Sequence, residues 1–195
     1  MAKVQWKATT ILNPVPAVMV TCADADGKPN IITLAWAGTI NSDPPMLSIS
    51  VRKERYSHNL IKERGEFAVN LANVATARQA DLCGVKSGRD VDKFKLTGLT
   101  AVPASQIDVP IIAESPISIE CVVRQVIELG SHDMFLAEIV AVDVEESLID
   151  KTGKLDIKKA DLICYSHGNY YSLDKLIGFF GYSVAGSDVL KRRMK

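Results

Sequence analysis

Residues 117–144 read ISIECVVRQVIELGSHDMFLAEIVAVDV and give the clearest indication of the fold. Apolar and polar side chains alternate from Ile117 to Ile127 and again from Met134 to Val144, which is the period of half-buried strands. The connection between them, ELGSHD, contains a glycine and suits a hairpin loop. The stretch therefore predicts a long antiparallel pair of strands.

Four shorter segments with strand patterns precede this pair. They are Val18 to Cys22, Ile31 to Ile40, Met46 to Val51 and Phe67 to Ala72. The first two are joined by DADGKPN, where an Asp-Gly step followed by proline between apolar runs is typical of a hairpin. The third follows a proline-rich turn, NSDPP at residues 41–45.

Short helices are predicted between the strands. Ser57 can cap a helix that Gly65 ends, and Val74 to Cys83 has the pattern of a second helix. SGRDVDKF (residues 87–94) contains only two apolar residues, so we expect a loop or a single turn there. The glycine- and aromatic-rich segment from His167 to Ser183 is predicted to be extended cover rather than core.

About six strands with a few short helices indicate a mainly β protein, an antiparallel six-stranded barrel with helical decoration. The chain has no repeat, low-complexity tract or long linker, so we predict one domain over residues 1–195. Within it, residues from about 165 to 195 are expected to form extended cover or a dimer contact. Six strands enclose little ligand by themselves. A cofactor would then sit on the outer wall or between two copies, and we expect a homodimer.

Charge and cysteine usage exclude several classes of function. Lysine plus arginine equals aspartate plus glutamate at 23 each, so no field of one sign attracts nucleic acid or an anionic membrane. The apolar stretch from Val15 to Val20 is interrupted by Pro16 and is too short for a signal or membrane segment. This favours a cytoplasmic protein. The four cysteines show no CxxC or Cys/His spacing, so we expect reduced thiols and no metal site.

The segment RKERYS (residues 52–57) is a candidate phosphate site. It places Arg52, Lys53 and Arg55 at the exit of a strand, just before a helix whose first turn carries the hydroxyl of Ser57. Free amide groups, the helix dipole and guanidinium groups together favour a monophosphate. A solvated basic turn followed by an ordinary helix cap explains the same residues, and the segment alone leaves both interpretations open.

The segment NIITLAWAGTI (residues 30–40) is a candidate site for a flat aromatic ligand. Trp36 stands between Ala35 and Ala37, with Gly38 next, in an otherwise aliphatic strand. Such small neighbours leave room for a planar ring system close to the backbone. A tryptophan that fills a gap in the core is the equally valid alternative.

Two polar loops supply the remaining candidates, Lys93 in SGRDVDKF and His132 in ELGSHD. Residues of these types in loops are also commonly just solvated. His58 and His167 show no convergent partners. The chain has no GxSxG elbow, no phosphate-binding glycine motif and no strand of interleaved basic and aromatic residues. These absences argue against a serine hydrolase, a P-loop or Rossmann protein and a nucleic-acid reader.

Taken in order, the segments resemble those of the flavin reductase-like FMN-binding split-barrel proteins, and among them the flavoredoxin type. The resemblance rests on the stretch from Pro16 to Ile61, then on GEFAVNL, SGRDVDKF, ESPISIECVV, LGSHDMFLAEIVAV, HGNYYSL and IGFFGYS. It implies an antiparallel split barrel, a flavin mononucleotide (FMN) bound noncovalently near the interface of a homodimer, and redox activity.

The resemblance also implies roles for individual residues. Asn30, Thr33 and Trp36 are expected on the strand that meets the flavin, with Trp36 beside the ring. Ser57 is expected at the phosphate end, with Arg55 nearby.

Three further cofactor contacts follow from the resemblance. Lys93 and His132 are expected as polar ligands that close the site, and Tyr165 as an aromatic side chain against the cofactor. A cation or an amide donor near the pyrimidine end of a flavin favours the reduced anionic ring; Lys93 and a backbone N–H are both candidates for this role. No residue is assigned as catalytic, although His132 is a candidate contact for nicotinamide or flavin.

Three functions follow, in two classes. As an oxidoreductase, the protein accepts electrons on bound FMN and passes them to flavin, metal or protein acceptors, or it acts as an NAD(P)H:flavin oxidoreductase that uses FMN as a transient substrate. NADH and NADPH are equally good candidates for the reductant. As a binding protein, it is a split barrel without a cofactor.

Overall fold

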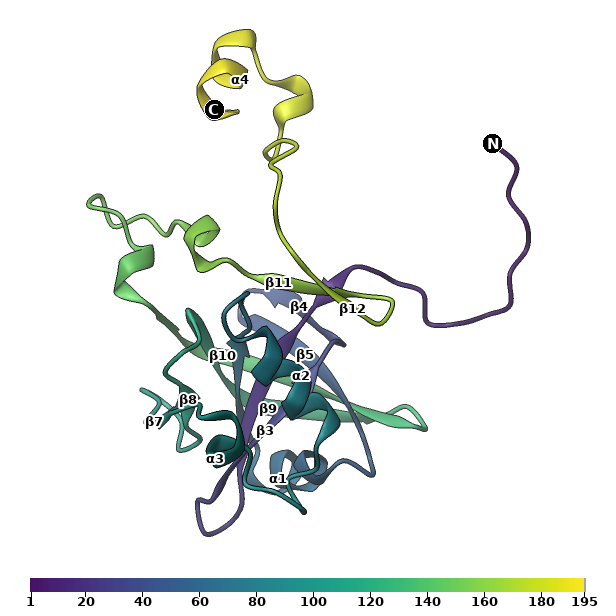
Figure 1. The fold of residues 1–195 in the computed structure, drawn as a ribbon, viewed down its shortest axis with the longest axis vertical. Coiled ribbons are helices and arrows are strands. Elements are labelled where there is room, and N and C mark those ends of the chain that lie inside the picture. The colour runs from purple at the N-terminus through teal and green to yellow at the C-terminus, as the bar shows by residue number, and fades with distance from the viewer. Residues whose placement is uncertain (195) are drawn as a thin grey trace.

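The computed structural model describes residues 1–194 and consists mainly of β-strands (Figure 1). The strands are β1 Val15–Pro16, β2 Val18–Ala23, β3 Pro29–Leu34, β4 Ala37–Ser42, β5 Pro45–Arg52, β6 Glu66–Leu71, β7 Ala101–Val102, β8 Ile111–Ile112, β9 Ile117–Glu128, β10 His132–Val144, β11 Ile163–Ser166 and β12 Asn169–Ser172. The helices are α1 Tyr56–Arg64, α2 Ala77–Val85, α3 Lys93–Thr97 and α4 Ser187–Arg193, with short 3₁₀ turns at Glu146–Leu148, Ile157–Ala160 and Tyr182–Val184.

The main sheet has seven strands in the order β3-β2-β6-β9-β10-β5-β4, and every neighbouring pair is antiparallel. Its two edge strands, β3 and β4, follow each other in the chain but do not pair, so the barrel remains open between them. The predicted antiparallel split barrel is therefore confirmed. The prediction of six strands is short by one.

The extra strand arises where one continuous strand was predicted from Ile31 to Ile40. The chain leaves the ladder with β2 after Leu34 and joins β5 from Ala37, with Ala35 and Trp36 between the two strands. The N–H of Ser50 in β5 already donates to the carbonyl of Trp36 at 2.9 Å. An apolar run does not reveal a change of pairing partner, because both halves keep the composition of a strand.

The predicted hairpin between Ile117 and Val144 is confirmed as β9 and β10, which pair from Asp133 with Glu128 to Val144 with Ile117. Predicted strands and helices elsewhere are displaced by only a few residues. SGRDVDKF is mostly loop, as predicted, but α3 already begins at Lys93 because Asp92 accepts the N–H of Lys95 and caps it.

Two apolar layers fix the barrel. Inside it, side chains such as Val20, Ile49, Phe67 and Phe135 form the main core. On the outer face of β2 and β3, Met19 and its neighbours pack beneath α2 and α3. Strand β2 is therefore buried on both faces, which explains why every residue of its sequence, VMVTCA, except Thr21 is apolar.

Helix α1 closes one end of the barrel with Leu60 and Ile61, which belong to the main core. Burial of two such side chains stabilises the fold by roughly 3–6 kcal/mol. Gly65 ends the helix in the left-handed conformation (φ 73°), and its N–H donates to the carbonyl of Ile61. This agrees with the predicted end of the helix and fixes the position of its first turn against β3.

Both terminal segments extend away from the barrel (Figure 1). Residues 1–12 are exposed, and after β12 the chain runs outward from Leu173 to the short helix α4. These segments carry exposed apolar side chains such as Trp6, Ile177 and Phe180. In the described residues, no helix is both long and apolar enough to cross a membrane.

Candidate functional site

The break between β3 and β4 places Trp36 at the opening of the barrel. Its side chain is 44% exposed, so it does not fill the core. The ring of His132, at the start of β10, lies against the indole with ring centroids 4.6 Å apart and an interplanar angle of 37°. Two residues predicted at the flavin, 96 positions apart in the sequence, therefore meet at one place.

The start of α1 differs from the prediction at Ser57. Arg55 occupies the N-cap position, with an extended backbone (φ −71°, ψ 136°) and no capping bond from its side chain. Ser57 lies in the first turn, is buried, and its Oγ accepts a hydrogen bond from Nδ2 of Asn30 at 2.8 Å. The predicted helix cap is thus wrong. The hydroxyl instead ties the helix to β3, and so joins two predicted site residues.

A hollow of about 190 Å³ lies beside this first turn, and we call it the cationic hollow. Four basic side chains, three hydroxyls and one carboxylate contribute to its wall. It is lined by Ile32, Glu54, Arg55, Tyr56, Ser57, Lys86, Ser87, Gly88, Arg89 and Lys93. The first turn of a helix also offers backbone N–H groups without intrahelical acceptors. Such a donor set favours an anion.

Arginines hold the walls of the cationic hollow together. Arg55 donates to the carbonyl of Gly84 at the end of α2. Arg89 donates to the carbonyl of Glu54 at 3.0 Å, and its guanidinium lies 5.7 Å from the centroid of the Tyr56 ring. The loop that follows α2 is thereby fixed against the start of α1.

Gly88 shows how tightly this loop packs. A Cβ at this position would lie 2.2 Å from Oδ1 of Asn30 and 2.6 Å from Cδ1 of Tyr56. No side chain fits in that space without displacing the side chains of Asn30 and Tyr56 or the loop itself. The close approach of the loop to β3 therefore requires glycine.

Lys93 lines the same hollow but is largely committed to the backbone. Its Nζ donates to the carbonyls of Ile31 and Cys83, each at 2.7 Å, and the residue is only 4% exposed. Burial lowers the pKa of Lys93 to about 8. With two of its three donors taken, Lys93 joins α3 to β3 and α2 and leaves one donor for a ligand.

A groove of about 330 Å³ lies farther along β3, and we call it the tyrosine groove. It is lined by Ala17, Thr33, Leu34, Ala35, Asp81, Gly84, Val85, Tyr165, Gly168 and Tyr170. The rings of Tyr165 and Tyr170 meet edge to face at 5.4 Å. Strand β3 contributes to both hollows: Ile32 lines the cationic hollow, and Thr33 and Leu34 line the tyrosine groove.

Polar contacts stiffen the tyrosine groove. The hydroxyl of Tyr170 donates to Asp81 at 3.3 Å, and burial, together with the nearby carboxylate, raises the pKa of Tyr170 to about 12. Thr33 donates through Oγ1 to the carbonyl of Ala80. The hydroxyl of Thr33 therefore serves the contact between β3 and α2.

A third hollow, of about 440 Å³, lies on the other side of Ala35, and we call it the indole pocket. It is lined by Thr9, Thr10, Ile11, Leu12, Val15, Ala35, Trp36 and Ala37. Its walls are mainly apolar, and the segment before β1 forms one of them. Both it and the tyrosine groove border Ala35, so a planar molecule at the break can contact either one.

The predicted site residues thus fall into two neighbouring groups. Asn30, Arg55, Ser57 and Lys93 surround or support the cationic hollow. Thr33 and Tyr165 line the tyrosine groove, and Trp36 with His132 stands at the break in the barrel. Position along β3 links the groups, since Asn30 and Leu34 are about 13 Å apart on an extended strand.

Sequence reasoning missed several residues of these walls. Lys86, Ser87 and Arg89 line the cationic hollow, and Asp81 and Tyr170 line the tyrosine groove. A small residue followed by arginine in SGRDVDKF was an available signal, because glycine next to basic and hydroxyl side chains suits an anion-binding loop. Asp81 and Tyr170 lie on α2 and β12, and no local sequence pattern predicts that these elements lie beside β3.

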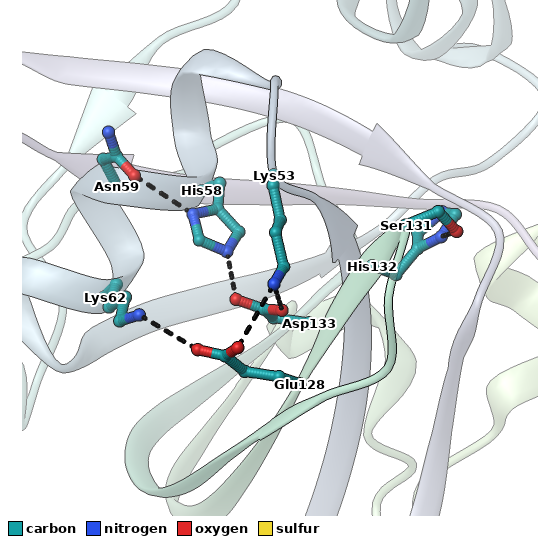
Figure 2. Close-up of polar contacts among 8 residues, drawn as sticks. All are labelled: Lys53, His58, Asn59, Lys62, Glu128, Ser131, His132 and Asp133. Carbon is teal, nitrogen blue, oxygen red and sulfur yellow. Dashed lines mark hydrogen bonds and ion pairs between the residues drawn. The ribbon is translucent and has the colours of Figure 1, made fainter.

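The prediction for His58 was also wrong. This residue was predicted to have no convergent partners, but its Nε2 lies 2.8 Å from Oδ2 of Asp133, and both residues are buried (Figure 2). The partner is 75 positions away in the sequence. Only the antiparallel placement of β10 beside β5 brings it to α1.

The open antiparallel sheet, with α1 across one end and ligand-sized hollows along β3, makes the chain a split-barrel protein of the mainly β class. The Flavin reductase like domain family matches residues 12–174. The chain therefore belongs to that family.

Known proteins agree with this assignment. A flavoredoxin of Desulfovibrio vulgaris (Miyazaki F) is 36% identical, with a TM-score of 0.85 over 91% of this chain and 97% of that chain. A flavoredoxin from Methanosarcina acetivorans is 29% identical, with a TM-score of 0.85 over 95% and 100% of the two chains. An uncharacterized protein of Archaeoglobus fulgidus is 32% identical over 145 residues, 74% of this chain and 81% of the relative. The fold and the family support an oxidoreductase-type role.

Proposed function

We propose that the protein binds one FMN per subunit and acts as an electron-transfer flavoprotein of the flavoredoxin type. One observation carries the proposal. The cationic hollow and the indole of Trp36 stand at successive positions along the same strand, β3 and its continuation, with the tyrosine groove between them. A ligand with an anionic end and a planar aromatic end matches this order of walls.

The donor set fits FMN at both ends. A terminal phosphate would lie in the cationic hollow, against Arg55, Ser57, Arg89 and the free amides of the first turn of α1. The isoalloxazine would lie at the break, between Trp36 and the tyrosine groove, where aromatic and small side chains form the walls. Lys93 is the residue best placed to offer a remaining donor beneath the ligand.

Bound flavin supplies the hydride and electron chemistry, and the protein supplies orientation, a tuned potential and solvent exclusion. In this chain the cross-linked walls of the cationic hollow fix the phosphate end. Burial, and the nearby cation of Arg52, lower the pKa of His132 below its ordinary value. A neutral imidazole beside Trp36 is therefore the form expected near pH 7, and it can donate or accept one hydrogen bond.

A reductase that accepts hydride from NADH or NADPH is the second candidate, and the indole pocket favours it. This pocket lies beside Trp36, is lined mainly by apolar side chains and has room for a second planar ring. Hydride transfer requires two rings held at close distance rather than a general base. In this version FMN itself is either the retained cofactor or an exchanging substrate.

We also propose that the chain works as a homodimer. The segments at residues 4–12 and 173–184 expose apolar side chains that do not pack in the barrel of their own subunit, among them Trp6, Ile177 and Phe180. A large exposed apolar surface marks an interaction site. Sedimentation or light scattering on the full chain should give twice the subunit mass, and a monomer at micromolar concentration would contradict the proposal.

The absorbance spectrum of the freshly purified protein tests the main proposal. We expect the visible bands of a flavin, or their appearance on a stoichiometric addition of FMN. Anaerobic NADH or NADPH then separates the two versions, since a reductase loses its colour rapidly and a carrier reduced by a protein partner stays yellow. A colourless protein that takes up no FMN would overturn both versions and leave a split barrel without a cofactor.

A further inference from the structure

A buried hydrogen bond between His58 and Asp133 joins α1 to the start of β10, outside the walls of the proposed FMN site (Figure 2). The Nε2–H of His58 donates to Oδ2 of Asp133 at 2.8 Å, and the two residues are 4% and 1% exposed. The ring of His58 also meets Phe135 edge to face, with centroids 5.4 Å apart. Both partners are thus held by the core as well as by each other.

Further charges hold the second oxygen of the carboxylate and the neighbouring hairpin end. Nζ of Lys53 lies 3.2 Å from Oδ1 of Asp133 and 3.3 Å from Oε2 of Glu128, and Lys62 lies 4.0 Å from the other oxygen of Glu128. The hydrogen bond from His58 and the ion pair with Lys53 lower the pKa of Asp133 against the effect of burial. The carboxylate is therefore ionised at neutral pH, accepts a hydrogen bond from His58 at Oδ2 and forms an ion pair with Lys53 at Oδ1.

This cluster is poor evidence for stability alone. A buried ion pair loses hydration energy that roughly offsets its attraction, and apolar replacements of whole pairs are often neutral or stabilising. Its geometric effect is more specific. It fixes the first turn of α1 and the start of β10 to each other at one register.

His132 immediately precedes Asp133, and neighbouring side chains on a strand point to opposite faces. While Asp133 points inward to His58, the ring of His132 lies outside against Trp36 at 4.6 Å. The preceding loop, Leu129 to Ser131, is exposed and contains Gly130 at φ 89°. His132 is held locally by the ladder with Arg52, by the N–H of Leu129, which donates to its carbonyl at 2.9 Å, and by Oγ of Ser131, 2.9 Å from its Nδ1. The anchored carboxylate of Asp133 ties this end of β10 to the buried core and to α1.

We propose that Asp133 is a positioning residue: held by His58 and Lys53, it keeps the imidazole of His132 against Trp36 at the ring end of the site. The proposal rests on the proposed function for its importance, although the contact itself can be measured without flavin. His58 follows Ser57 in the first turn of α1. One helical turn therefore supports the phosphate end through Ser57 and the ring end through His58, Asp133 and His132.

The experiment uses the full chain without flavin, in a Trp6→Phe background that leaves Trp36 as the only tryptophan. A protonated imidazole quenches the emission of an indole in contact with it. Burial and Arg52 lower the pKa of His132, whereas Glu54 opposes them. Emission should therefore fall on acidification, with a midpoint below the ordinary histidine value, and His132→Gln should abolish this change.

Four variants test the role of the cluster. Asp133→Asn removes the carboxylate and His58→Ala removes its donor, whereas His58→Gln restores a donor close to the Nε2 position. Glu138→Gln is the matched control, because Glu138 lies on the same strand and pairs with Arg124 at 2.8 Å on the exposed side. Circular dichroism and thermal melting establish that each variant is folded.

We expect Asp133→Asn and His58→Ala to lose most of the pH-dependent change in Trp36 emission, and His58→Gln and Glu138→Gln to keep it. The affinity for FMN should fall about tenfold in Asp133→Asn and His58→Ala, a loss equivalent to one hydrogen bond. It should stay unchanged in His58→Gln and Glu138→Gln. If Asp133→Asn does not fold, the comparison of His58→Ala with His58→Gln tests the proposal.

An unchanged titration in folded Asp133→Asn or His58→Ala would overturn the proposal, as would the absence of a titration in the parent. A normal titration pattern in a chain that never binds FMN would refute the proposed function and leave the positioning contact in place.

Discussion

The two ends of the proposed FMN site are built differently. The cationic hollow is cross-linked on every side, by Ser57 to Asn30 and by Arg55 and Arg89 to backbone carbonyls. At the other end, Trp36 is 44% exposed and its main aromatic contact is the ring of His132. Preformed donors lose little entropy when a ligand binds, so the cationic hollow is suited to tight binding. The open end leaves room for a second reactant.

The largest expected effect comes from filling the space at Gly88. Gly88→Ala places a carbon 2.2 Å from Asn30 and 2.6 Å from Tyr56. Because this carbon displaces side chains that hold the loop against β3 and α1, the dissociation constant of FMN should rise about 100-fold, which corresponds to the upper range for overpacking. Flavin fluorescence titration measures it. Gly186→Ala, where an added Cβ meets open space, should bind FMN like the parent.

The next largest effect is expected at Arg55, and a comparison of FMN with riboflavin distinguishes the phosphate end of the site from the ring end. Arg55→Met removes a guanidinium from the cationic hollow and should weaken FMN about 30-fold, as expected for a charge-assisted contact with phosphate. Riboflavin lacks the phosphate, so its affinity should stay within a factor of about two. Arg124→Met is the control for a lost surface arginine. Equal losses for the two ligands would show that Arg55 does not face the phosphate.

A smaller effect is expected at the ring end. Trp36→Leu should weaken the binding of FMN and of riboflavin, each by about tenfold, because aromatic contacts contribute on the order of 1 kcal/mol beyond the effect of the surface area that they bury. Isothermal titration of both ligands gives the two factors. A loss confined to FMN would place the phosphate, rather than the ring, near the indole.

The smallest effect concerns stability beneath the cationic hollow. Folding lowers the pKa of Lys93 from 10.5 to about 8, so between these values the unfolded chain binds more protons and stability rises with pH. In flavin-free protein, the free energy of unfolding of the parent relative to Lys93→Met should rise by about 1 kcal/mol from pH 7 to pH 9. Urea titrations at both pH values measure it. A flat or falling difference would mean that the ammonium group is solvated.

The sequence predicts the ladder of strands better than the ends of the site. Alternation over Ile117–Val144 and the turn chemistry before Ile31 and Met46 determine local structure directly, and the structure confirms them. The break at Ala35–Trp36 escaped prediction because pairing with β2 and pairing with β5 require the same side-chain pattern.

For the site, the sequence identified residue types but not all of their tasks. Ser57 was expected as a helix cap and instead accepts from Asn30. His58 was set aside because its partner, Asp133, is distant in sequence. Arg89 was overlooked in a loop whose polarity alone suggested solvent. Each error concerns a contact between elements, which no local periodicity encodes.

Whether the phosphate and the ring of FMN bind at the two ends of one site is tested by following the emission of Trp36 while FMN or riboflavin is added to the Trp6→Phe chain. We expect saturable quenching at one FMN per chain, and the same final quenching by riboflavin at a concentration at least about tenfold higher. Emission that saturating FMN leaves unchanged, or equal affinity for the two ligands, would contradict this expectation.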